Sequence, residues 1–180
     1  MKILERYISE PETLWLLKKV IGSFEKSPGK GLPLGNLTSQ LLVNVYMNGF
    51  DQFVKHELKV KHYVRYADDF AILSSNHDWL RIILPEINNF LGNRLKLFLH
   101  PNKVSIRTWS SGIDFLGWIC FPDHEVLRTA TKRRALKNIA ANQNPAKVAS
   151  YLGMLQHGNA KGIEVKISKL THLAPEPFPC

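Results

Sequence analysis

Cysteines and long apolar runs are scarce in this 180-residue chain, and each absence excludes a class of protein. Its two cysteines, Cys120 and Cys180, are too few and too far apart for a disulfide framework or a zinc site. No run of 18 apolar residues occurs, so no membrane-spanning helix is expected. The first six residues lack the apolar core of a signal peptide. We therefore expect a cytoplasmic protein.

The overall composition is that of a folded protein with an excess of positive charge. Hydrophobic residues make up 44% of the chain and charged residues 22%, which is ordinary for a globular domain. The formal net charge is +9 and the isoelectric point is near 9.6. Such an excess attracts polyanions, of which nucleic acid is the commonest, although charge alone is weak evidence for binding.

Helical periodicity and turn residues divide the chain into segments. Apolar residues recur at helical spacing in several stretches, and proline and glycine clusters separate them. The predicted helices cover residues 14–24, 39–58 and 78–95, with a basic helical region beginning at Arg128. A loop is predicted over residues 27–35, and a disordered tail over residues 174–180.

Alternating apolar and polar residues predict short strands between the helices. Residues 61–73 read as two strands around a tight Ala-Asp-Asp turn. Further strands are predicted at residues 97–99 and 104–106, and another hairpin begins within residues 113–119. Helices mixed with antiparallel hairpins indicate an α+β fold.

The sequence Tyr66-Ala67-Asp68-Asp69 carries the strongest chemical signal. Two adjacent carboxylates at a hairpin turn repel each other, and a bound divalent cation removes that cost. Magnesium prefers carboxylate oxygens, and nucleotidyl transfer uses two such ions. The alternative is a solvated Asp-Asp turn without a ligand, which is the commoner reading of a bare Asp-Asp pair.

This motif resembles the fifth conserved block of reverse transcriptases, and residues 31–40 followed by Asn44 resemble the block just upstream. The resemblance implies that Asp68 and Asp69 are catalytic ligands of two Mg²⁺ ions in the complete enzyme. It also implies a set of residues that approach the template and the incoming nucleotide. These are Leu34, Gly35, Ser39, Gln40, Asn44 and Tyr66.

The upstream block also narrows the subfamily. Group II intron reverse transcriptases usually have Gln-Gly before the helix and Ser-Pro at its start. This chain has Leu34-Gly35 and Ser39-Gln40 instead, which resembles the reverse transcriptases of diversity-generating retroelements. That resemblance implies template RNA, a cDNA primer and deoxynucleoside triphosphates as partners, together with an accessory variability protein.

Three segments further along resemble later parts of the same family. Lys103 matches a lysine that would protonate the leaving pyrophosphate as a general acid. Phe115, Leu116 and Gly117 lie in a segment that resembles the primer-grip hairpin. The alternatives are a surface lysine and an ordinary core hairpin. A basic stretch resembles the start of the thumb, where it would contact the nucleic-acid backbone, or it is a solvated helix face. Its residues are Arg128, Lys132, Arg133, Arg134 and Lys137.

The resemblance implies a polymerase palm, with an antiparallel sheet and helices on one face, followed by the start of a helical thumb. We assign the palm to residues 1–127, the thumb to residues 128–173 and the tail to residues 174–180. The family's fingers and first palm strand, which bears another catalytic aspartate, have no counterpart here, since Asp51 is the first aspartate. Because the two-metal site needs that carboxylate, we expect this chain to be inactive alone.

Two other functions remain open from the sequence. The chain is a non-catalytic remnant that binds nucleic acid or a partner, or it belongs to a group II intron or a defence-type reverse transcriptase. The Ser39-Gln40 pair speaks against the intron and defence types. Primer extension distinguishes an enzyme from a remnant.

Overall fold

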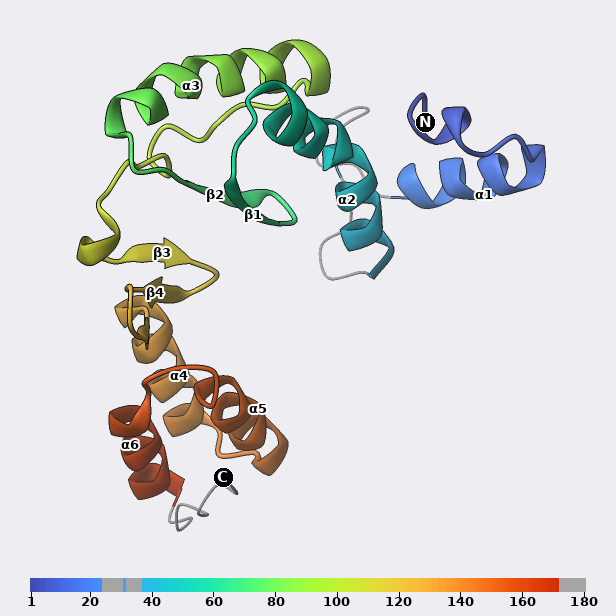
Figure 1. Ribbon diagram of the computed structural model, residues 1–180. Helices are drawn as coiled ribbons and strands as arrows, with labels where there is room; N and C mark the ends of the chain where they lie inside the picture. Colours follow the sequence, from blue (N-terminus) through green and yellow to red (C-terminus); the bar gives the residue numbers. More distant parts are fainter. Residues whose placement is uncertain (24–30, 32–36, 172–180) are drawn as a thin grey trace. The chain divides into compact units, whose positions relative to one another are not determined.

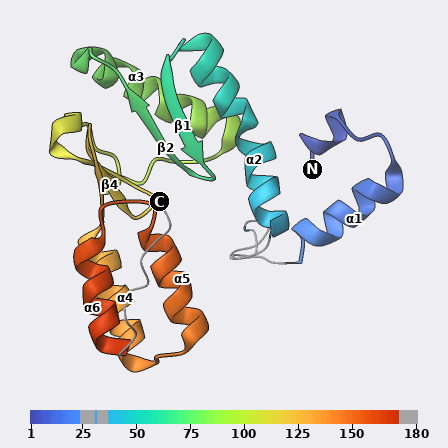
Figure 2. The same cartoon turned by 60° about the horizontal axis from the view of Figure 1, so that its bottom comes forward.

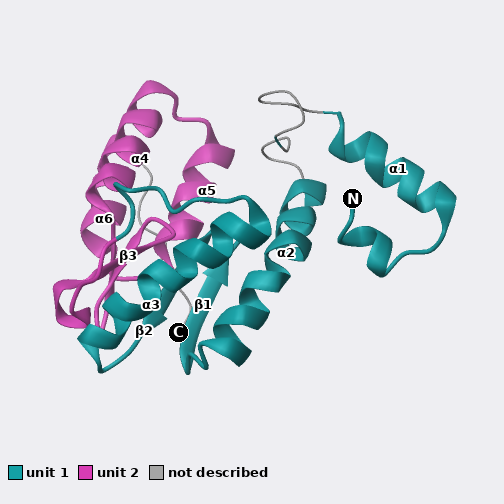
Figure 3. Cartoon of the chain, turned by 90° about the horizontal axis from the view of Figure 1, so that it is seen from above, with its two compact units in different colours: residues 1–104 teal, residues 105–180 magenta. Residues whose placement is uncertain are grey.

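The computed structural model describes residues 1–23, 31 and 37–171 (Figure 1). The chain forms two compact units, Met1–Val104 and Ser105–Cys180, which Figure 3 colours separately. Both units combine helices with small antiparallel sheets, so the predicted α+β class is confirmed. Within the described ranges, no helix has the length and apolarity needed to cross a membrane.

Unit 1 contains helices and one hairpin. In chain order its elements are η1 (Leu4–Arg6), α1 (Pro11–Ile21), α2 (Leu37–Gln52), η2 (Phe53–Glu57), β1 (His62–Tyr66), β2 (Asp69–Leu73), α3 (His77–Phe90) and η3 (Leu91–Leu95). The three helices predicted from periodicity are present, each within a few residues of its predicted bounds. The predicted loop at residues 27–35 falls almost wholly outside the described residues.

The core of unit 1 lies between the two long helices and one face of the β1–β2 hairpin. Phe50 of α2 is fully buried, and its ring meets Phe70 of β2 edge-on, with 4.9 Å between ring centroids. Phe53 stacks on Phe90 of α3 at 4.2 Å. The opposite face of β1 is open, since Val64 is 46% exposed. Burial of large aromatic side chains on one face therefore fixes the hairpin against α2 and α3.

Both long helices of unit 1 end in the same way. Each finishes in a five-residue π-helical turn, followed closely by a lysine with positive φ, Lys59 at 53° and Lys96 at 54°. The amide of Val60 then bonds the carbonyl of Val54, six residues back, as in a Schellman motif. These caps satisfy the last helical carbonyls and turn the chain sharply, into β1 after η2 and into the segment that follows η3.

The strands predicted at residues 97–99 and 104–106 are wrong. Both segments have irregular backbone, with a turn at residues 101–103 between them. Phe98 is 81% exposed, and Leu97 and Val104 are partly exposed, whereas Leu99 packs against the core of unit 1 without being part of a strand. A three-residue segment forms a stable strand only when a neighbouring strand pairs with it, and neither segment has such a partner among the residues that the structure describes.

Unit 2 contains a three-stranded sheet and three helices. Its elements are η4 (Trp109–Ser111), β3 (Ile113–Phe115), β4 (Trp118–Cys120), β5 (Glu125–Leu127), α4 (Thr129–Ala141), α5 (Pro145–Leu155) and α6 (Lys161–Thr171). The sheet order is β3-β4-β5, all antiparallel. The hairpin expected within residues 113–119 is confirmed, and β5 adds a strand that the sequence did not predict.

The helices of unit 2 pack side by side around a small apolar core (Figure 2). Its most buried members are Leu127, Ile139, Val148, Leu155 and Ile167. Trp118 of β4 packs against this core, which joins the sheet to the helices. The basic helix predicted from Arg128 is confirmed as α4.

Candidate active site

Asp68 and Asp69 lie at the tip of the β1–β2 hairpin. Tyr66 pairs with Asp69, which leaves Ala67 and Asp68 as the two residues of the turn. Both aspartates are exposed to solvent. Ala67 has a φ of 52°, a left-handed conformation that is unfavourable for any residue with a Cβ atom. The predicted hairpin therefore exists, and it presents two neighbouring carboxylates on a strained turn.

The Arg65 side chain joins this turn to helix α2 through hydrogen bonds. Its Nη1 donates to the Ala67 carbonyl at 2.7 Å and to Oδ1 of Asn44 at 3.1 Å. Its Nε and Nη2 donate to the two carboxylate oxygens of Asp51 at 2.7 and 2.6 Å. The Tyr63 hydroxyl donates to the same carboxylate at 2.7 Å. The guanidinium thus bridges α2 and the turn that bears Asp68.

These contacts shift the pKa values of the three groups. Burial raises the pKa of Asp51, but hydrogen bonds from Arg65 and Tyr63 and the guanidinium charge outweigh it, so that pKa lies below its ordinary value. Burial and the hydrogen bond to Asp51 raise the pKa of the Tyr63 hydroxyl. The hydrogen bond to Asp51 raises the pKa of Arg65. Asp51 is therefore ionised, and its carboxylate accepts three hydrogen bonds from Arg65 and Tyr63.

The amino-terminal half of α2 reaches the same hairpin. Gln40 Nε2 donates to the Tyr66 hydroxyl at 3.1 Å. Ser39 is buried, and within the described residues its hydroxyl has no hydrogen-bond partner. The structure therefore brings Gln40 and Asn44 to the strand that leads to Asp68. The predicted Leu34 and Gly35 lie outside the described residues.

Lys103, the predicted general acid, is exposed in the turn at residues 101–103, where its amide bonds the His100 carbonyl at 2.9 Å. No ion pair joins its ammonium to Asp68 or Asp69 in the part of the chain that the structure describes. Within residues 1–23, 31 and 37–171, no three His, Cys, Asp or Glu side chains gather as a metal site. The aspartate pair thus offers two oxygen ligand groups from one turn.

The predicted primer-grip residues form the β3–β4 turn of unit 2. Phe115 pairs with Trp118, so Leu116 and Gly117 are the two turn residues. Both have positive φ, 52° and 89°, as a type I′ hairpin turn requires. Leu116 is 46% exposed. An apolar side chain is therefore presented at the tip of a tight hairpin.

The basic stretch divides into an anchored residue and a free face. Arg128 forms an ion pair with Asp114, and its amide bonds the Gly117 carbonyl at 2.9 Å. This arginine therefore links the hairpin to the start of α4. On α4 itself, Lys132 is half-buried, and Arg133, Arg134 and Lys137 are exposed. Helix α4 has no acidic residue and four basic ones, which are Lys132, Arg133, Arg134 and Lys137.

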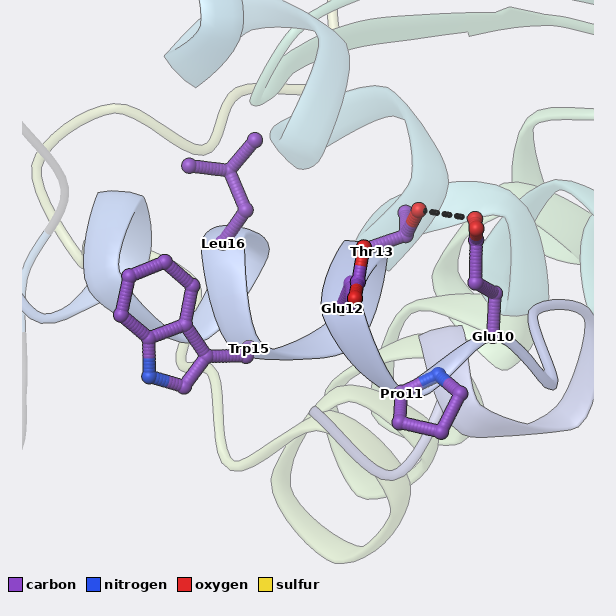
Figure 4. A pocket seen from close by; sticks show the side chains of 6 residues that line it. All are labelled: Glu10, Pro11, Glu12, Thr13, Trp15 and Leu16. Carbon is purple, nitrogen blue, oxygen red and sulfur yellow. Dashed lines mark hydrogen bonds between the residues drawn. The ribbon is translucent and has the colours of Figure 1, made fainter.

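A shallow hollow on α1 is separate from these residues. It is lined by a short stretch that includes Glu10, Trp15 and Leu16, and Figure 4 shows the last two side chains on the helix. The Thr13 hydroxyl bonds the Glu10 carboxylate at its edge. The lining comes from one helix start, and it includes no residue of the hairpin or of α2. The candidate site is therefore the Asp68–Asp69 hairpin and not this hollow.

A family model described as reverse transcriptase (RNA-dependent DNA polymerase) matches residues 4–120, well over half of the chain. The chain belongs to the reverse transcriptase family. The match includes the Asp68–Asp69 hairpin, α2 and the β3–β4 turn. It ends before Arg128, so the thumb assignment rests on the sequence resemblance alone.

Two curated relatives match this chain at low identity. The COX1/OXI3 intron 2 protein of Saccharomyces cerevisiae is 29% identical over 112 residues, covering 62% of this chain and 12% of the yeast protein. Protein YkfC of Escherichia coli is 29% identical over a region that covers 65% of this chain and 41% of YkfC. The chain therefore spans less than half the length of each of these two relatives.

Arg65, Asp51 and Tyr63 were not predicted as parts of the site. Tyr63 and Arg65 are two residues apart on β1, so both lie on the face that packs toward α2. Val64, between them, lies on the exposed face. A charged residue at an inward strand position requires a buried partner. Asn44 and Asp51 are seven residues apart, about two helical turns, so both lie on one face of α2. That spacing was the available signal, but it does not say which strand the face meets.

Proposed function

We propose that this chain is the catalytic-hairpin part of an RNA-directed DNA polymerase that copies template RNA into cDNA. The observation that supports this most directly is the pair Asp68 and Asp69, exposed at the tip of a tight hairpin inside the region that matches the reverse transcriptase family. Template RNA, a cDNA primer and deoxynucleoside triphosphates are the substrates that this function requires.

The donor groups fit magnesium. Asp68 and Asp69 supply hard carboxylate oxygens, and their mutual repulsion is relieved when a divalent cation binds. Mg²⁺, when bound, would activate the primer 3′-hydroxyl and neutralise the triphosphate. The two aspartates would hold it, Tyr66 and Gln40 would lie against the template or nucleotide, and Lys103 would donate a proton to the leaving pyrophosphate.

The remaining tasks would be divided between a palm and a thumb. We assign residues 1–127 to a palm and residues 128–173 to the start of a thumb. Leu116, exposed at the β3–β4 turn, would contact the primer strand together with Phe115 and Gly117. Lys132, Arg133, Arg134 and Lys137 of α4 would contact phosphates. Such contacts position a protein on a duplex without reading its sequence. Arg128 would act through its ion pair with Asp114.

The subfamily has two candidates. Leu34-Gly35 and Ser39-Gln40 favour a diversity-generating retroelement, with an accessory variability protein as a partner. The similarity to the yeast intron 2 protein favours an intron-encoded enzyme. We propose the first, because it rests on residues that the family resemblance implies lie near the template, whereas the similarity to the yeast protein rests on 29% identity.

The 180-residue chain is expected to polymerise poorly by itself. Two metal ions need carboxylates from more than one strand, and the described residues supply one pair on one turn. A non-catalytic chain that only binds nucleic acid is the alternative, and the same residues would then be relics of a polymerase.

The test combines metal binding, nucleic-acid binding and primer extension. Mn²⁺, a paramagnetic substitute for Mg²⁺, is titrated while the amide signals of Asp68 and Asp69 are followed by NMR. Binding of an RNA–DNA primer-template is measured in parallel, and extension is measured with Mg²⁺. Asp68→Asn tests the metal site, and Asp78→Asn, an exposed aspartate at the start of α3, is the matched control.

We expect Mn²⁺ to broaden the Asp68 and Asp69 signals in the wild type and in Asp78→Asn, and not in Asp68→Asn. Primer-template should bind, with little or no extension. Failure to bind both Mn²⁺ and primer-template would contradict the proposed function. Robust extension that Asp68→Asn abolishes would establish a polymerase and contradict the expectation that the site is incomplete.

A further inference from the structure

The side chain of Arg65 connects the two parts of the candidate site. Its guanidinium makes four hydrogen bonds, two to Asp51, one to Asn44 and one to the Ala67 carbonyl. Only 9% of this side chain is exposed. An arginine is strongly bound in such a position because its planar fork matches a carboxylate with two parallel hydrogen bonds.

The acceptors on α2 form a rigid seat. Asn44 and Asp51 are about two helical turns apart, so their side chains emerge on the same face of one helix. Helix α2 is anchored in the core of unit 1 by Phe50, which is fully buried. Arg65 is therefore bound to a helix whose position in the core does not depend on the hairpin tip.

The remaining contact of Arg65 is with the turn. The carbonyl of Ala67 belongs to the peptide unit that joins Ala67 to Asp68, and a peptide unit is planar. A hydrogen bond to that carbonyl therefore fixes the orientation of the peptide plane that precedes Asp68. Ala67 has its left-handed φ of 52° at the same place, and alanine does not favour this conformation by itself. The hydrogen bond from Arg65, 2.7 Å long, stabilises it.

We propose that Arg65 is a positioning residue that holds the Ala67–Asp68 turn on α2 and so pre-organises Asp68 and Asp69 for a divalent cation. This inference rests on the proposed function, since it concerns the same metal site. It adds that α2 is the common support. Gln40 and Asn44, which are predicted to approach template and nucleotide, lie on the helix that orients the metal ligands.

Two variants test the inference in the 180-residue chain. Arg65→Lys keeps the charge but loses the fork that binds Asp51 and the turn together. Asn44→Ala removes one acceptor from an exposed position and leaves the Asp51 pair intact. Arg81→Lys, at an exposed position on α3, and Asn48→Ala, one turn further along α2, are the matched controls. The readouts are the Kd for Mn²⁺ and the hydrogen-exchange rates of the Asp68 and Asp69 amides.

Arg65→Lys should weaken Mn²⁺ binding about tenfold, the loss typical when a group that orients a metal ligand is removed. The Asp68 and Asp69 amides should exchange about tenfold faster, since the turn opens more often. Asn44→Ala should change both quantities in the same direction by a smaller factor. Both controls should remain within about twofold of the wild type, with unchanged circular dichroism.

A folded Arg65→Lys variant with wild-type Mn²⁺ affinity and wild-type exchange would overturn the inference. If that variant does not fold, Asn44→Ala decides, and wild-type values there would overturn it. If the wild type binds Mn²⁺ no better than Asp68→Asn and also fails to bind primer-template, the proposed function fails. Faster exchange in Arg65→Lys would still support the positioning role in that case, so the two failures are distinguishable.

Discussion

Asp51 accepts three hydrogen bonds on its carboxylate, two from the Arg65 guanidinium and one from the Tyr63 hydroxyl. This ion pair crosses from helix α2 to strand β1 and lies beside the aromatic core of unit 1. Since the partners come from segments 14 residues apart in sequence, the pair stabilises tertiary packing rather than a local turn.

The first prediction concerns Asp51→Asn. Asp51 has a lowered pKa in the folded chain, so its ionised form stabilises the fold above the ordinary pKa of 3.8. That contribution is lost as the pH falls through the lowered pKa. At pH 7 the variant should lose about 2 kcal/mol of unfolding free energy, the usual scale for a hydrogen bond to a charged group. The difference should shrink below pH 4.

Urea unfolding at pH 7, 5 and 3 measures this difference. Glu86→Gln, which neutralises an exposed carboxylate on α3, serves as the control and should match the wild type closely at each pH. A gap between Asp51→Asn and the wild type that is equal at pH 7 and pH 3 would show that the charge of Asp51 is not responsible.

The second prediction concerns Gly158. A Cβ atom there would lie 2.3 Å from Cζ3 of Trp118, far inside van der Waals contact. Gly158→Ala should therefore destabilise unit 2 by about 2 kcal/mol, as overpacking of a core does. Gly153→Ala and Gly162→Ala, on α5 and α6, meet nothing within 4 Å and should be neutral or stabilising. Thermal unfolding compares the three, and equal melting temperatures would refute the prediction.

The third prediction concerns the left-handed lysine after η2. Lys59 has a φ of 53° and an exposed side chain. Glycine adopts this conformation without the Cβ clash, so Lys59→Gly should stabilise unit 1 by about 1 kcal/mol. Lys61→Gly, two residues further, removes the same side chain where φ is not positive, and it should not stabilise. Chemical denaturation distinguishes them, and a loss of stability in Lys59→Gly would be the contrary result.

The sequence predicted those elements whose signal is local. Residues 39–58 and 78–95 form helices, and residues 62–73 form a hairpin, because their apolar periodicity also decides their burial. The strands predicted at residues 97–99 and 104–106 failed for the opposite reason. Their apolar residues are in short segments, and a strand requires a partner that no local pattern specifies.

The site was predictable to the same extent. Asp68 and Asp69 were recognised from adjacent letters, and the structure has them on the expected turn. Arg65 was not recognised, because its role depends on which helix face meets β1. Arg128 was expected to contact nucleic acid, and the structure adds an ion pair with Asp114 that the sequence separation of 14 residues concealed.

The fourth prediction concerns nucleic-acid binding by α4. Its exposed cations should contribute to the salt dependence of binding, since each phosphate contact releases counterions. Arg133→Gln with Arg134→Gln should lower the slope of log K against log salt by about 2, about one for each lost contact. Lys166→Gln with Lys169→Gln removes the same charge from α6 and is the control. Equal slopes for both double variants would attribute binding to net charge and not to α4.

The last prediction concerns association through β1. Within the described residues, β1 pairs only with β2, so its other edge has unpaired backbone groups. Val64 and Tyr66 are 46% and 53% exposed on this strand. An exposed apolar edge strand promotes pairing with another chain, so the isolated chain should dimerise or aggregate at micromolar concentration.

A charge on the edge strand tests this directly. Val64→Lys should shift the chain toward monomer in sedimentation velocity, because lysine on an edge strand opposes edge-to-edge pairing. Val165→Lys is the matched control, since Val165 is 48% exposed but lies on α6. If both variants remain associated to the same degree, the contact lies elsewhere. If the wild type is a stable, monodisperse monomer, the β1 edge is covered in some other way, and its exposure does not drive association.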